Sequence, residues 1–202
     1  MIYLTGEKKF ISEPQSTYMF RLYTGKQRIR LEAGDGAFLI SENAKDALFK
    51  RGECDLISNF FCTVIRGYAP AERSCALEAP TNLPYINGCS TRQLFAPERP
   101  GDPTWQMLHM PAHTKEQMHH IHPTARVVYV YRGRGLSLVG MAGHCQTTEL
   151  VEGMTCVLPP MCPHHFETKD SDLIVLPVQV WSSVAGQDFN HPMFIGTLKV
   201  DF

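Results

Sequence analysis

The sequence predicts an all-β fold. Fourteen prolines and fifteen glycines are spread along the 202 residues, and short apolar runs lie between them, which is typical of many strands joined by turns. The length suits one well-filled core, or one domain with a substantial extension. We expect strands over residues 18–23, 27–31, 36–40, 55–65, 104–110, 127–132, 136–141, 154–158, 173–180 and 193–200.

In chain order, the first strands are apolar runs separated by turns. Residues 41–50 begin with Ser41, a good helix cap, and predict either one helical turn or a loop. Residues 66–103 are dense in Pro and Gly without sustained periodicity, which predicts an internal boundary. We therefore expect a β-rich extension over 1–95 and a second unit over 96–202. Within the second unit, Arg-Gly-Arg-Gly (132–135) is expected to turn the chain.

The charge and hydropathy of the sequence limit the classes of binding partner and the compartment that we expect. Lys and Arg number 19 against 20 Asp and Glu, so no overall field favours nucleic acid or an acidic membrane. No apolar run approaches the ~20 residues of a membrane span, and the N-terminus is too polar for a secretory signal. The seven cysteines are scattered without a C-x-x-C pair, which favours a reducing compartment. We expect a cytoplasmic protein with a small-molecule partner.

All nine histidines lie at or beyond His109, so histidine chemistry belongs to the second half of the chain. In "MHHIHP" (118–123), His120 and His122 share one face of an extended segment, and His119 points the other way. Two imidazoles at this spacing can bind one cation. A third ligand is available from "GMTCVLPPMCPHHF" (153–166), where His164 follows a double proline and His165 is expected to face away.

These residues resemble the two motifs of the cupin superfamily, G-x5-H-x-H-x(3,4)-E-x6-G and G-x5-P-x-G-x2-H-x3-N. The matching positions of the first motif are Thr114, His120, His122, Arg126 and Gly133, and those of the second are Gly153, Pro159, Met161, His164 and Thr168. Arg126 replaces the usual Glu. Thr114 and Met161 replace glycines, and Thr168 replaces Asn. The resemblance covers about 75 residues of the C-terminal half.

The resemblance implies an antiparallel jelly-roll barrel that holds one divalent metal ion on His120, His122 and His164. It is similar to cupins that lack the Glu and use a 3-His site, including thiol dioxygenases and gentisate-type dioxygenases. Fe(II) is the expected metal, with Zn, Ni, Mn or Cu as alternatives, because neutral imidazoles leave the full charge for an anionic chelating substrate. The first half is expected to be either a β extension or a degenerate second cupin.

Arg126 has two interpretations. It either faces the barrel interior and binds a substrate carboxylate, or it pairs with a structural acid such as Glu149 or Glu152. In the first case Val128 and Val130 share its face as an apolar wall, and Tyr129 and Tyr131 pack on the opposite side. Arg126, Tyr129 and Tyr131 are the candidate catalytic residues, and the tyrosines matter most for a proton-transfer reaction.

Three functions follow from these residues. The first is a metal-dependent oxidoreductase, a 3-His iron dioxygenase acting on a small anionic substrate as a homodimer. The second is a non-redox isomerase, cyclase or lyase, and the third is a non-catalytic small-molecule-binding cupin. Three residues are expected to pack in the core or at the rim, with a place at the pocket edge as the alternative: Trp105, Gln106 and Trp181. His109 is expected to be structural, with a pocket position as the alternative, and His144 is expected in a surface turn and not as a ligand. Cys162 is expected to be a buried thiol, with a redox-sensitive thiolate beside the metal as the alternative.

Overall fold

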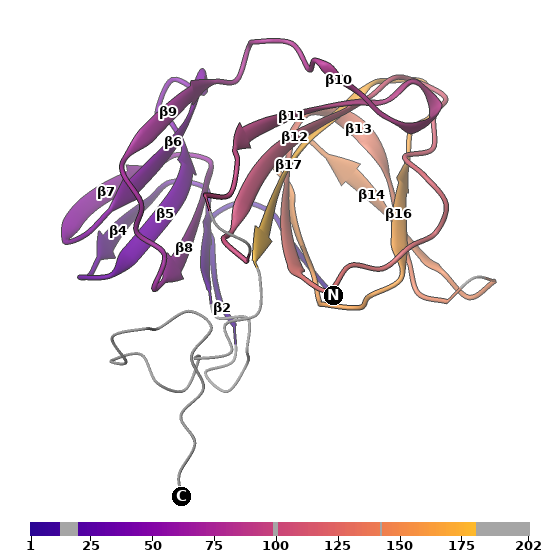
Figure 1. Ribbon diagram of the computed structural model, residues 1–202. Coiled ribbons are helices and arrows are strands. Elements are labelled where there is room, and N and C mark those ends of the chain that lie inside the picture. Colours follow the sequence, from indigo (N-terminus) through magenta and orange to yellow (C-terminus); the bar gives the residue numbers. More distant parts are fainter. Residues whose placement is uncertain (13–19, 99–100, 142, 181–202) are drawn as a thin grey trace, which may run out of the picture.

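The computed structural model describes residues 1–12, 20–98, 101–141 and 143–180, and it shows an antiparallel all-β protein in two parts (Figure 1). The first part is a sheet of order β2-β3-β8-β5-β6-β9 with a separate pair β4-β7. Its strands are β2 (Lys8–Ile11), β3 (Arg21–Thr24), β4 (Gln27–Leu31), β5 (Asp35–Ile40), β6 (Asp46–Arg51), β7 (Cys54–Ser58), β8 (Phe61–Arg66) and β9 (Arg73–Ala76).

The second part is the barrel, on the right of Figure 1. Its main sheet has the order β1-β15-β13-β17-β12-β11-β10, and β14 and β16 both pair with β13. The strands are β1 (Ile2–Leu4), β10 (Leu83–Pro84), β11 (Ser90–Phe95), β12 (Thr104–Met110), β13 (Ala125–Val139), β14 (Gln146–Val151), β15 (Thr155–Leu158), β16 (His164–Glu167) and β17 (Leu173–Val180). A 3-10 turn (Ile86–Gly88) follows β10. Among the described residues, no helix is long and apolar enough to cross a membrane.

Strand β13 belongs to both sheets of the barrel. Its first half pairs with β15 and β17, and its second half pairs with β14 and β16. Gly133 lies between the halves at φ +84°, and a Cβ there would lie 1.9 Å from the carbonyl oxygen of Asp172. Only glycine tolerates both the backbone conformation and the close approach. The prediction that residues 132–135 turn the chain is therefore wrong, because these glycines bend one continuous strand.

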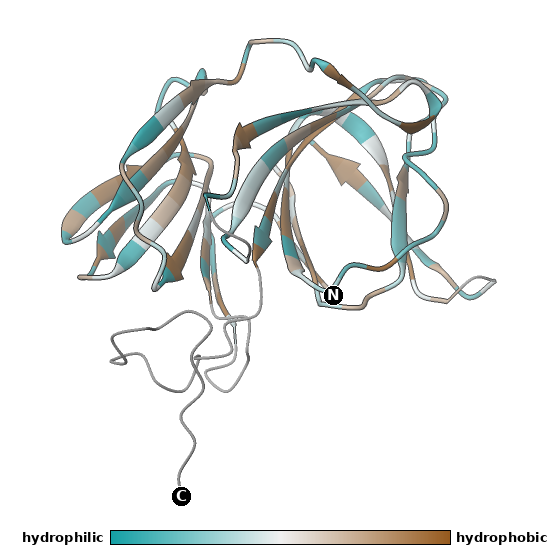
Figure 2. Cartoon of the chain, viewed as in Figure 1, coloured by the Kyte–Doolittle hydropathy of each residue, from teal (hydrophilic) through white to brown (hydrophobic). Residues whose placement is uncertain are grey.

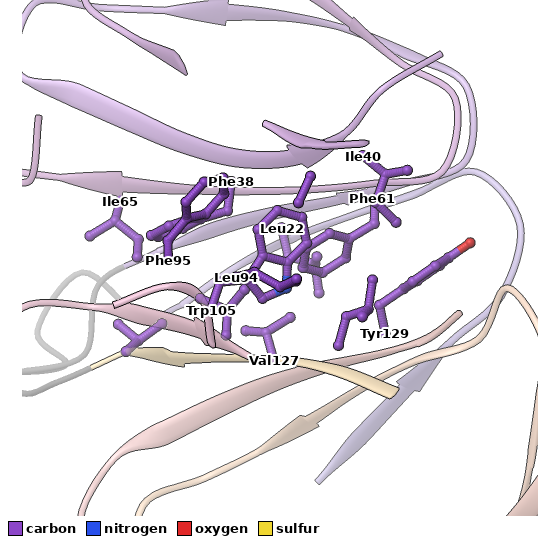
Figure 3. Packing of buried hydrophobic residues seen from close by; sticks show 14 of the residues in the cluster. Leu22, Phe38, Ile40, Phe61, Ile65, Leu94, Phe95, Trp105, Val127 and Tyr129 are labelled. Carbon is purple, nitrogen blue, oxygen red and sulfur yellow. The ribbon is translucent and has the colours of Figure 1, made fainter. Parts of the chain in front are cut away.

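Alternate residues of β13 enter two different cores. Tyr129 and Val127 join the cluster that packs the barrel against the first part, where the rings of Phe61 and Trp105 lie 5.8 Å apart and those of Phe61 and Tyr129 lie 5.4 Å apart (Figure 3). Val128 and Val130 instead join the cluster inside the barrel. Brown and teal residues alternate along strands of the first part in Figure 2, as expected where one sheet face is buried.

The expected all-β, jelly-roll class is confirmed. Strands over 27–31, 104–110 and 173–180 have the predicted bounds. The expected strand over 55–65 is wrong, because it is two strands, β7 and β8. Of the two alternatives for residues 41–50, the loop holds for residues 41–45, which lead into the unexpected strand β6. The expected strand over 193–200 and Trp181 lie outside the described residues.

The division of the chain at residue 95 stays a prediction. The main sheet of the barrel contains strands from both sides of residue 95, since β1 pairs with β15 and β11 pairs with β12. Residues from both ends of the 1–95 segment thus complete the wall of the barrel.

Candidate metal centre

Three histidines converge at one end of the barrel. The segment carrying His120 and His122 runs antiparallel to the start of β16, and the backbones of His120 and His164 exchange hydrogen bonds of 3.1 and 2.9 Å. The nearest ring nitrogens of the three residues all lie within 4.8 Å of one another. Among the described residues, this is the group of side chains that meets the geometry of a metal site. The structure thus brings together the three residues that the motifs predicted.

Two of the rings are oriented by backbone carbonyls. The Nδ1 of His120 donates to the carbonyl of Met118 at 3.0 Å, and the Nδ1 of His164 donates to that of Cys162 at 2.8 Å. These bonds leave each Nε2 unprotonated and available as a ligand atom. Carbonyl-oriented imidazoles are the usual arrangement around protein-bound metals.

The histidines are held in their neutral form. Burial is the first cause, and it lowers the pKa of His164 to about 4 and that of His122 to about 3, with the charge of Arg126 acting in the same direction. The pKa of His120 is also lowered, mainly by burial. Because metals bind imidazole without its proton, this environment favours ligation.

Arg126 faces the barrel interior. It lies opposite Leu158 in the register of β13 and β15, and its Nη2 donates to the Nδ1 of His122 at 3.2 Å. Glu149 instead accepts from Arg134 at 3.1 Å. The inward interpretation of Arg126 therefore holds, and burial lowers the pKa of its guanidinium to about 10.

The neutral rings form a hydrogen-bond chain with Arg126. Because the guanidinium donates to Nδ1 of His122, the hydrogen of that ring sits on Nε2, which donates to Nε2 of His120 at 2.8 Å. Two nitrogens that each lie about 2.1 Å from one ion at a right angle are about 3 Å apart, so this spacing fits a shared metal. The donor set of three neutral imidazoles fits a divalent first-row metal.

A second pair of histidines lies behind the first. His165 faces away from the centre, as predicted, and its Nδ1 lies 2.7 Å from the Nδ1 of His119. The Nε2 of His165 lies 2.9 Å from Oε1 of Glu167, and the Nε2 of His119 donates to the carbonyl of Gly140. His119 and His165, the chain neighbours of the candidate ligands His120 and His164, thus form a second contact between the segment of His120 and strand β16.

Tyr129 and Tyr131 do not reach the histidines. Tyr129 is buried against Phe61, and the hydroxyl of Tyr131 donates to the carbonyl of Ala44 at 3.0 Å. Both side chains lie on the face of β13 opposite Arg126, so the structure removes the geometric basis for a catalytic role. Their packing positions agree with the alternation expected from the sequence.

Sequence reasoning missed one residue of the interior. Glu116 is 5% exposed, and its backbone N–H donates to the carbonyl of Phe166 at 3.0 Å. Burial raises the pKa of this carboxyl to about 7, although Arg126 acts to lower it. The motif directs attention to a Glu after H-x-H, whereas this one lies four residues before His120. A carboxylate in the segment leading into H-x-H is the signal that would have found it.

The other candidate pocket residues lie away from the centre, apart from Cys162, whose carbonyl orients His164. Trp105 is fully buried between the two parts, Gln106 accepts from Gln179, and His109 donates to Asp172 at 3.0 Å outside the barrel interior. His144 is exposed in the β13–β14 turn. The thiol of Cys162 is half-buried, and burial raises its pKa.

The fold and the site define an antiparallel β barrel with a three-histidine group at one end, and this arrangement resembles the cupin superfamily. No protein-family model matches the sequence, and no curated protein matches it. Similar solved structures include a cupin 2 conserved barrel domain protein from Leptotrichia buccalis, with 16% identity and a TM-score of 0.47 over 89% of each chain.

Two further structures are similar over the barrel. The DMSP lyase DddQ from Ruegeria pomeroyi has 20% identity and a TM-score of 0.42, covering 50% of this chain and 56% of the lyase. The EutQ protein of Clostridium difficile has 14% identity and a TM-score of 0.44, covering 55% and 88%. The chain thus spans little more than half of the lyase. All three TM-scores are below 0.5.

Proposed function

We propose that this protein is a metal-dependent cupin-type enzyme with a three-histidine centre, and that it acts as an iron dioxygenase on a small anionic substrate. The observation that supports this proposal is the convergence of His120, His122 and His164 beside an inward Arg126. Bound Fe(II) would supply a dipositive charge for a chelating anion and one-electron chemistry with O2.

The proposed role of Arg126 depends on the hydrogen-bond acceptor that it loses when His122 binds a metal ion. When His122 ligates through Nε2, its ring hydrogen sits on Nδ1, and Arg126 loses the acceptor that it has in this structure. A largely buried guanidinium without an acceptor is costly, so a substrate carboxylate at this position is stabilised. Val128 and Val130 supply an apolar wall beside it and exclude water.

A non-redox reaction is the second candidate, and Glu116 favours it. A buried carboxyl near neutrality in the same interior can hold or move a proton, which an isomerase or lyase requires and Tyr129 and Tyr131 cannot supply from their positions. Metal remains part of this alternative as a Lewis acid.

Elemental analysis and oxygen uptake test these proposals together. Protein purified without chelators is expected to carry about one first-row metal ion per chain, and His122→Ala is expected to lose it while the surface variant His144→Ala retains it. Oxygen consumption with a panel of small carboxylic acids supports the dioxygenase, whereas turnover that persists without oxygen supports the second candidate. If wild-type protein neither contains nor retains added Fe(II) or Zn(II), both proposals are wrong.

The homodimer also stays a prediction. Sedimentation of the purified protein measures it directly.

A further inference from the structure

Two oppositely charged side chains lie in the barrel interior without pairing. Glu116 is only 5% exposed, and its Oε2 has no hydrogen-bond partner. The Nε of Arg126 is also buried and without a partner. Among the described residues, no ion pair joins the two groups within 4.0 Å. Each therefore has a buried polar atom that no other group among the described residues pairs with.

Both groups belong to the interior that contains the three histidines. Lys115 pairs with Glu167 at the partly exposed side of this segment, whereas the next side chain, Glu116, is buried. Arg126 reaches His122 at 3.2 Å. The charges of Glu116 and Arg126 act in opposite directions on the phenol of Tyr85, whose pKa is raised mainly by burial. Glu116 and Arg126 therefore both act on Tyr85, and Arg126 connects this pair to the candidate metal centre through His122.

This arrangement is costly for the protein alone. A buried carboxylate oxygen and a buried guanidinium N–H each lose their hydration, and neither recovers it from a neighbour. A direct ion pair would compensate for part of this loss, yet the two side chains remain apart. A buried charged group without a partner is uncommon in folded proteins, and a catalytic or binding role is one of its physical explanations.

We propose that Glu116 and Arg126 form a two-ended recognition site for a small zwitterion, with the ligand's carboxylate on Arg126 and its ammonium group on Glu116. The inference rests on the proposed function and names the substrate class of the same centre. A simple monoanion satisfies Arg126 only, and it brings a second negative charge towards Glu116. A zwitterion pairs both side chains and adds no net charge to the buried interior.

Binding measurements test the pairing directly. The ligands are the ω-amino acids from glycine to 5-aminopentanoate and the matched unsubstituted acids from acetate to pentanoate, titrated into the protein as purified. At the preferred length, the amino acid is expected to bind at least ten-fold more tightly than its matched acid. Glu116→Gln is expected to remove this ratio, because the amino acid loses the partner of its ammonium group and the acid no longer meets a second negative charge, and Arg126→Met is expected to weaken both. Equal binding of each pair, or no binding of any amino acid, overturns the proposal.

Thermal unfolding provides a second measurement that needs no ligand. If Glu116 serves a ligand, Glu116→Gln removes an uncompensated buried charge, and the unfolding temperature stays level or rises. If Glu116 instead stabilises the barrel through Arg126, the same variant unfolds several degrees lower, which overturns the proposal. Glu149→Gln is the matched control, because its carboxylate forms an exposed pair with Arg134.

Different results contradict the zwitterion-recognition site and the proposed metalloenzyme. Loss of zwitterion selectivity in a protein that retains its metal contradicts the recognition site alone. Selective binding in a protein without metal contradicts the metalloenzyme alone.

Discussion

Replacing His164 with Asn is expected to make the stability of the metal-free protein less sensitive to low pH. His164 is 3% exposed, and burial lowers its pKa to about 4. In the unfolded chain the same ring has a pKa of about 6.5. Between these two values the unfolded state binds a proton that the folded state does not, so wild-type stability falls as the pH decreases from about 6.5 and levels off below about 4.

The magnitude follows from the size of this shift. A histidine with these two pKa values costs about 1.2 kcal/mol of stability at pH 5.5 and about 2.4 kcal/mol at pH 4.5, relative to pH 7. The asparagine of the His164→Asn variant does not titrate, and its amide can still donate to the carbonyl of Cys162 that His164 Nδ1 contacts at 2.8 Å. The difference in stability between variant and wild type should therefore shift in favour of the variant as the pH falls.

Urea unfolding in the presence of a chelator, at several pH values from 7 to about 4.5, measures this difference. Titrating groups away from the three histidines act equally in both proteins and cancel. His144→Asn serves as the control, since His144 is exposed in a turn, and its profile should follow that of wild type. A wild-type-to-variant difference that stays constant with pH would refute the claim that burial holds His164 neutral.

Three further predictions concern the surroundings of the site. His119→Ala removes the contact to His165 behind the centre and should weaken metal binding about 10- to 100-fold without unfolding the protein, as measured by competition with a chromophoric chelator. Phe61→Ala opens the core between the two parts and should cost about 3–5 kcal/mol in urea unfolding, whereas Ala at the exposed Ile57 should change little. Asp35→Asn leaves two arginines without their fully buried carboxylate and should cost about 3 kcal/mol in the same assay, compared with less than about 1 for Asp55→Asn at the surface.

The sequence predicted those elements that carry a regular period or a rigid spacing. Strands β4, β12 and β17 have the expected bounds, because each is an apolar or alternating run closed by turn residues. The spacing of His120 and His122 indicates a shared face, and the resemblance to the second cupin motif indicates His164. The inward direction of Arg126 followed from the same alternation that placed Tyr129 in the opposite core.

The failures come from interactions between distant segments. Gly133 resembles a turn residue locally, and only the approach of Asp172 shows that it bends a strand between two sheets. Glu116 lies in an irregular segment where no period applies, and its burial depends on β16, about fifty residues later in the chain. The two tyrosines were considered for catalysis by residue type, although alternation had already assigned them to packing.

Strand β13, which contributes to both cores, determines whether the barrel can exist without the first part of the chain. Val128 lines the metal-site interior and Tyr129 lies in the core against the first part, so a single peptide unit separates the two environments. A truncated chain that started at residue 96 would lack β1 and β11 and would expose Trp105 and Tyr129 to water. Such an exposed aromatic face is a site of aggregation. The barrel is therefore not a detachable module, and genetic exchange that preserves its chemistry has to carry the first 95 residues with it.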